Sequence, residues 1–142
     1  MGTLRSLRWP DDRPALLALD VSFSSDYMYN VVQTDRSLAL HRVPLIAPLQ
    51  KDYHFAPDVD TLPTFDAVVV AERTRDLVGI AAMRLESWNR RVNLVHCHVA
   101  RGARGQGIGR ALIAATVAYA QTHVARCVAG KAEHQLSRHP IL

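Results

Sequence analysis

Cysteine and long apolar runs are scarce in this sequence. Its two cysteines, Cys97 and Cys127, are too few for a disulfide framework. Both lie in apolar runs, where free thiols are commonly buried, so we expect both to be buried structural residues. No segment approaches the roughly 18 apolar residues of a membrane span, and residues 1–10 lack the pattern of a signal peptide. These absences predict a soluble, cytoplasmic protein.

The chain has only a slight excess of positive charge. Seventeen Lys and Arg face 13 Asp and Glu, giving a net charge of +4. The basic residues are scattered except between 90 and 110, where no aromatic residues are interleaved, so nucleic-acid binding is the least favoured interpretation. With 49% apolar residues in 142, the chain can bury one core. We therefore expect a single domain over residues 1–142.

The first half of the chain predicts an opening strand, a helix and a hairpin. Leu4 to Trp9 suits a strand, and Asp11 or Asp12 suits the cap of a helix with Pro14 in its first turn. Residues 28–33 and 38–43 suit the two strands of a hairpin. The prolines that follow predict a loop with a short helix; they are Pro44, Pro48, Pro57 and Pro63.

The second half predicts an antiparallel meander followed by a glycine loop and a helix. Residues 66–73, 77–88 and 92–99 are strand-like and are separated by short turns, which antiparallel neighbours allow. Residues 101–107 are basic and glycine-rich, and residues 108–120 form an Ala-, Leu- and Ile-rich helix. A strand over 124–129 would then lie parallel to 92–99. The fold class is α/β (α+β) with a mixed sheet.

The glycine loop has the chemistry of an anion site. Backbone N–H groups at a helix start lack intrahelical partners, the helix dipole adds positive potential, and glycines let a phosphate approach the main chain. Arg104 and Arg110 reinforce the positive charge. A P-loop would need Gly-Lys followed by Ser or Thr, and a dinucleotide fingerprint would need glycine at Arg110. Neither pattern is present.

The loop resembles the acyl-CoA signature of the GNAT superfamily of N-acetyltransferases, which Arg104, Gly107 and Gly109 match. The resemblance implies acetyl-CoA as cosubstrate and no metal. It implies that the loop holds the diphosphate of the cofactor through Arg104, Gly105, Gln106, Gly107, Ile108 and Gly109, with Arg110 adjacent. It also implies that the main chain of Cys97, His98 and Val99 holds the pantetheine arm and the thioester oxygen.

Within this superfamily, the chain is most similar to streptothricin acetyltransferases. The similarity rests on residues 7–9, the hairpin, and Trp88 and Asn89 before the strand that leads into the loop. It implies transfer of an acetyl group from acetyl-CoA to a primary amine of a small molecule such as a streptothricin-like antibiotic. The alternative is an inactive domain that binds CoA, or that forms a strand-exchanged homodimer through exposed sheet edges.

The catalytic groups are less well indicated than the loop. His96 and His98 share one face of their strand, so either suits a general base near neutral pH, although packing is the alternative role. Streptothricin-type enzymes carry Glu and Asp where Val95 and His96 align here. Tyr119 does not match the position of the family's acid. Aromatic and acidic side chains suit a cationic amine, and the acceptor-site candidates are Asp26, Tyr29 and Trp88, with Tyr27 nearby.

The end of the chain departs from the family pattern. The further helix and the closing strands that follow the parallel strand in such enzymes have no counterpart here, and the expected acid is missing with them. Back-translation of residues 128–142, read one nucleotide later, allows a string that resembles the absent family segment. We therefore expect a C-terminally incomplete domain with a frameshift near Cys127; a disordered basic tail is the alternative.

Overall fold

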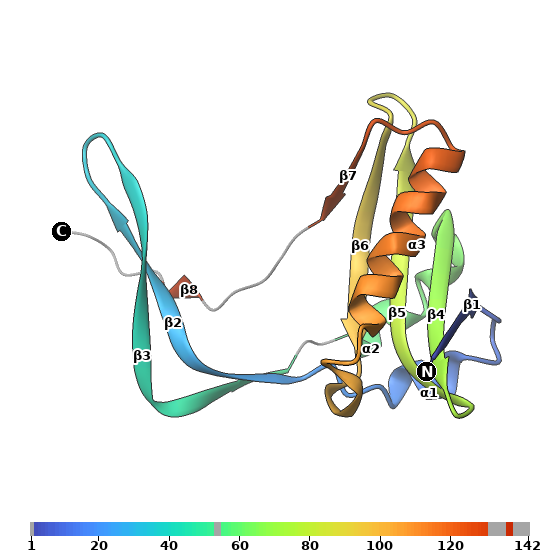
Figure 1. The fold of residues 1–142 in the computed structure, drawn as a ribbon, viewed down its shortest axis with the longest axis horizontal. Helices are drawn as coiled ribbons and strands as arrows, with labels where there is room; N and C mark the ends of the chain where they lie inside the picture. The colour runs from blue at the N-terminus through green and yellow to red at the C-terminus, as the bar shows by residue number, and fades with distance from the viewer. Residues whose placement is uncertain (1, 53–54, 131–135, 138–142) are drawn as a thin grey trace. The chain divides into compact units, whose positions relative to one another are not determined.

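The computed structural model describes residues 2–52, 55–130 and 136–137. The chain forms two compact units (Figure 1). The first contains residues 1–21 and 53–131, and the second contains residues 22–52 and 132–142. No helix among the described residues is long and apolar enough to cross a membrane.

A five-stranded mixed sheet forms the centre of the first unit. Its strands, in spatial order, are β1 (Thr3–Ser6), β4 (Ala67–Arg73), β5 (Asp76–Glu86), β6 (Arg91–Val99) and β7 (Cys127–Gly130). The four strands from β1 to β6 pair antiparallel, whereas β7 pairs parallel to β6. The predicted meander and the predicted parallel strand are both confirmed.

Helices cover both faces of this sheet (Figure 1). Helices α1 (Arg13–Leu17) and α2 (Ala56–Val59) lie on one face, and α3 (Ile108–Thr122) lies on the other. Successive strand residues point to opposite faces, so each helix meets its own set of apolar side chains. Buried Val70, Ile80 and Ala82 pack with the α1 and α2 side, and buried Ala81 and Met83 pack with the α3 side.

Helix α3 packs closely against β5. Its buried residues are four positions apart, which places them on one face; they are Ile108, Leu112, Thr116 and Ala120. A Cβ at Gly79 of β5 would lie 3.2 Å from both the Ile108 and Leu112 side chains. Glycine at 79 therefore lets the first turn of α3 approach the sheet, and that turn follows the glycine loop.

Asp12 precedes α1 as predicted, but its side chain does not cap the helix. The carboxylate accepts the Arg8 backbone N–H at 2.7 Å and pairs with the Arg5 guanidinium at 2.7 and 2.8 Å. Arg5 also donates to Glu72 of β4 at 2.7 Å. The Arg5 guanidinium holds the pKa of Asp12 below its ordinary value. This network ties β1 and the start of α1 to β4.

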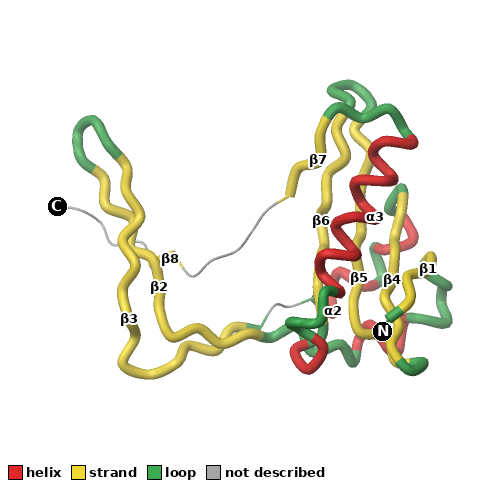
Figure 2. Tube along the Cα trace, in the orientation of Figure 1, coloured by secondary structure: helices red, strands yellow, loops and turns green. Residues whose placement is uncertain are grey.

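The second unit contains the predicted hairpin, which is longer than expected (Figure 2). Strands β2 (Phe23–Gln33) and β3 (Leu38–Lys51) pair antiparallel, and Thr34 donates its N–H to the Ser37 carbonyl at 2.9 Å. The two-residue strand β8 (Leu136–Ser137) pairs parallel to β2. The loop predicted at Pro44 and Pro48 is wrong, because both lie within β3. That strand has β2 as its one described neighbour, and an edge strand tolerates residues without an N–H.

Two further expectations concern the later part of the chain. The prediction that both thiols are buried is wrong, because Cys97 and Cys127 are exposed. The frameshift and the missing closing strands were expected from residues 128–142. Most of that segment, residues 131–135 and 138–142, lies outside the described residues.

Candidate active site

The glycine loop joins β6 to α3 and places two glycines at positive φ. After a short 3-10 turn at residues 101–103, φ is +77° at Gly105 and +84° at Gly107. This left-handed backbone favours glycine because a Cβ would crowd the main chain. A Cβ added at either position would have no other heavy atom within 4 Å. Space in front of the loop is therefore open to a ligand.

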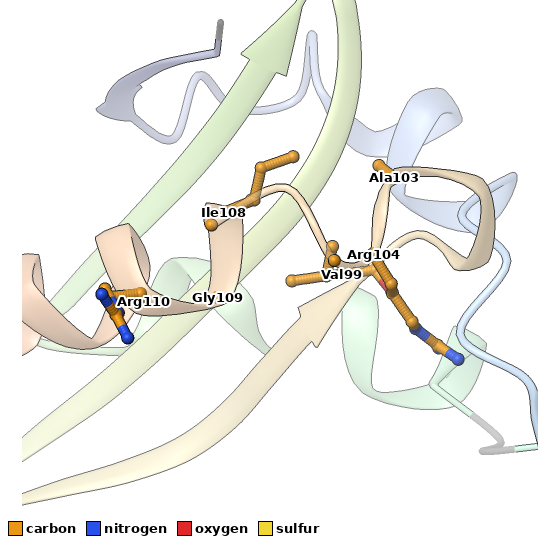
Figure 3. Close-up of a pocket in the computed structure, with 8 residues that line it drawn as sticks. Val99, Ala103, Arg104, Ile108, Gly109 and Arg110 are labelled. Carbon is orange, nitrogen blue, oxygen red and sulfur yellow. The ribbon is translucent and has the colours of Figure 1, made fainter.

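The start of α3 presents backbone donors to that open space. Its first helical hydrogen bond runs from the Ala111 N–H to the Gly107 carbonyl at 3.0 Å. The N–H groups of Ile108, Gly109 and Arg110 precede this bond, so they are the donors that a helix cannot satisfy internally. A pocket of about 300 Å³ opens here (Figure 3), lined by Val99, Ala103, Arg104, Gly105, Gly107, Ile108, Gly109 and Arg110.

Two arginines make the pocket positive. The Arg104 Nε donates to the Val99 carbonyl at 3.0 Å, which ties the loop back to the end of β6. Arg110 lies in the first turn of α3, which carries no acidic side chain. Figure 3 shows the two side chains leaving the loop in different directions. Together with the helix dipole, they favour an anion that spans the loop.

Strand β6 leads to the pocket and contains an irregularity that the sequence analysis missed. Met83 pairs with Leu94 and Ala82 pairs with His96, so Val95 is an extra residue in β6. Such a bulge turns the local peptide groups out of the ladder. The bulge lies two residues before Cys97, in the strand that also carries His98 and Val99.

His96 and His98 lie beside each other, with ring centroids 6.0 Å apart, and both pack against an aromatic side chain. The Phe55 ring centroid lies 5.3 Å from that of His96 and 4.9 Å from that of His98. Burial, followed by the positive charge of Arg84, lowers the pKa of His96, against the opposing effect of Asp58. Burial, His96 and Arg104 lower the pKa of His98 to about 4. Both imidazoles are therefore neutral at pH 7.

The predicted acceptor-site residues belong to different units. Asp26 and Tyr29 lie on β2, where the pairing shifts register between Ser25 and Tyr27. The Arg42 guanidinium already lies over the Tyr27 ring, 3.9 Å from its centroid. Trp88 lies in the turn between β5 and β6 with 84% of its surface exposed. A shared acceptor site for these residues stays a prediction.

The described residues contain no group of three His, Cys, Asp or Glu side chains that could hold a metal ion. The pocket's donors are instead main-chain N–H groups and guanidinium groups. Donors of this kind bind phosphate or carboxylate oxygens.

Known proteins resemble this chain over most of its length. It is 37% identical over 120 residues to streptothricin acetyltransferase of Streptomyces lavendulae, and the match covers 77% of this chain and 61% of that relative. The chain thus spans about three fifths of the relative's length.

Solved structures show the same fold. A crystal structure of nourseothricin acetyltransferase matches with a TM-score of 0.75 and 32% identity, covering 87% of this chain and 69% of that one. A Bacillus anthracis protein in complex with acetyl coenzyme A matches with a TM-score of 0.69 and 16% identity, covering 90% and 73%. The model of the acetyltransferase (GNAT) family matches residues 27–139. The chain belongs to the GNAT acetyltransferase family.

Proposed function

We propose that this chain binds acetyl-CoA at the glycine loop and transfers the acetyl group to a primary amine of a streptothricin-like small molecule. The observation that carries the proposal is the open backbone at Gly105 and Gly107, beside the N–H groups that precede the first hydrogen bond of α3 and two arginines. The CoA diphosphate is an anion of matching size and chemistry. The family membership and the names of the two antibiotic-modifying relatives support the same activity.

The individual residues take the following roles in this proposal. The diphosphate lies against Arg104, Gly105, Gln106, Gly107, Ile108 and Gly109, with Arg110 beside it. The extended pantetheine arm lies along the main chain of Cys97, His98 and Val99, in the manner of an added strand. Donors from this strand polarise the thioester carbonyl where negative charge develops.

Of the two histidines, His96 is the stronger candidate for the general base. A base with a pKa near 4 accepts a proton poorly at pH 7, which disfavours His98. Asp58 opposes the lowering of both pKa values, but it is the second-largest influence on His96 and the smallest on His98. Replacing His96 with Gln should therefore lower kcat and flatten the acidic limb of the pH profile. His98→Gln should retain that limb. If His98→Gln instead flattens the limb and His96→Gln retains it, His98 is the general base.

Calorimetric titration with acetyl-CoA, followed by an assay of thiol release with streptothricin, tests the function. Arg110→Met should weaken binding about fivefold, because it removes a cation beside the diphosphate. Arg126→Met is the matched control, since this exposed residue follows the opposite end of α3. No binding by the unaltered chain would refute the proposal. Binding without thiol release would support the alternative of an inactive CoA-binding domain.

The remaining expectations stay predictions. They are that residues 1–142 form one domain, that the protein lies in the cytoplasm, and that the inactive alternative forms a homodimer. Sedimentation of the unaltered protein at several concentrations tests the last of these.

A further inference from the structure

A side chain of the glycine loop reaches back to the meander. The Arg73 Nη1 donates to Gln106 Oε1, joining two residues 33 positions apart in the sequence. Gln106 lies between Gly105 and Gly107, the two residues of the loop at positive φ. Glycines have the widest backbone freedom, so the peptide between them needs an external contact to hold it in one orientation.

Arg73 is well placed to supply that contact. It is the last residue of β4, it pairs with Asp76 of β5, and it is half-buried. The two-residue turn between them has φ values of +52° at Thr74 and +68° at Arg75. Turns of this geometry match the twist of paired strands, so they keep the strand ends in register. The Arg73 guanidinium thus extends from the well-ordered end of the β4–β5 hairpin toward a loop that contains two conformationally free glycines.

We propose that Arg73 is a positioning residue that pre-orders the glycine loop through Gln106. This inference rests on the proposed acetyl-CoA site. A loop already held in its binding conformation loses less conformational entropy when the ligand binds. Arg73 therefore raises affinity without touching the ligand, in contrast to Arg110, which lines the pocket.

A double-mutant cycle tests the proposal by acetyl-CoA calorimetry on the full chain. The variants are Arg73→Met, Gln106→Ala and their combination. Each single variant should weaken binding about threefold to tenfold, the effect of losing one charge-assisted hydrogen bond at an exposed site. The double variant should lose no more than the larger single loss, because both changes remove the same side-chain contact and Ala keeps the main-chain N–H that the proposed function assigns to the diphosphate at 106. Arg75→Met, which removes the neighbouring charge, should change affinity less than about twofold.

Ionic strength separates positioning from direct contact with a phosphate. A positioning effect should persist from low to high salt, whereas a direct charge interaction should fade with screening. All variants should still unfold in one cooperative transition well above the assay temperature, which shows that the binding losses come from folded protein. Fully additive losses, or an Arg73→Met loss that vanishes at high salt, would overturn the inference while the proposed function stands. Failure of the unaltered chain to bind acetyl-CoA would overturn both.

Discussion

Substitutions at Gly107 can distinguish two effects of an added side chain. One is backbone strain, which lowers stability, and the other is steric exclusion of the ligand, which lowers affinity. Its φ is +84°, and a Cβ there would meet no other heavy atom within 4 Å. Replacing Gly107 with Ala therefore costs conformational strain without a steric clash. A non-glycine residue in the left-handed region loses about 1 to 2 kcal/mol. For a compact unit of this size, each kcal/mol lowers the unfolding temperature by about 4 to 8 °C, so the expected drop is about 4 to 16 °C.

Gly102 is the matched control for this substitution. It lies in the same loop with the same open surroundings, but its φ is not positive. Ala at 102 should leave stability unchanged or raise it by about 0.4 to 1 kcal/mol, because it restricts the unfolded chain. Asn at 107 should cost less than Ala, since Asn tolerates left-handed backbone. Thermal unfolding by circular dichroism measures all three variants.

Acetyl-CoA binding completes the comparison. Both Ala and Asn at 107 place side-chain atoms in the space assigned to the diphosphate, so both should weaken binding, whatever their stability. The Gly102→Ala variant should bind normally. Equal unfolding temperatures for Gly107→Ala and Gly102→Ala would refute the strain argument. Unchanged affinity in both 107 variants would refute the placement of the ligand.

Three further outcomes follow from the core and its charges. Arg5→Ala should lower the free energy of unfolding in urea by about 2 to 3 kcal/mol, since it leaves the buried Asp12 carboxylate unpaired; a loss below 0.5 kcal/mol would contradict this. Leu112→Ala should cost about 2 to 5 kcal/mol, because the side chain is fully buried; Ile113→Ala, at an exposed site on the same helix, is its control. The folded pKa of His98, about 4, lies below the ordinary 6.5, so its stability contribution is complete above pH 6.5 and is lost as pH falls toward 4. Because His98 is partly exposed, this loss should reach about 1 kcal/mol at pH 5, and a His98→Asn variant with an equal loss would exclude His98 as its source.

Most of the fold could be predicted from sequence patterns between neighbouring residues. The predicted meander, the parallel strand and α3 are all present, because strand and helix periodicity is written into neighbouring residues. The glycine loop was predictable for the same reason. Positive φ at Gly105 and Gly107 is a property of single residues, and the helix donors follow from the start of α3.

Features that depend on a residue far away in the sequence could not be predicted from such local patterns. Pro44 and Pro48 look like strand breakers, yet they are compatible with β3 because β2 is its one neighbour among the described residues. Asp12 looks like a helix cap, but Arg5 draws its carboxylate into an ion pair. The exposure of Cys97 likewise depends on which elements surround β6.

The amino-acid order alone therefore specified most of the elements and the glycine loop, since these arise from interactions between near neighbours in the chain. Only packing in three dimensions placed Phe55 beside His96 and His98, inserted Val95 as a bulge, and brought Arg73 to Gln106. These contacts join residues far apart in sequence, and they form because burial and strand pairing bring those residues together.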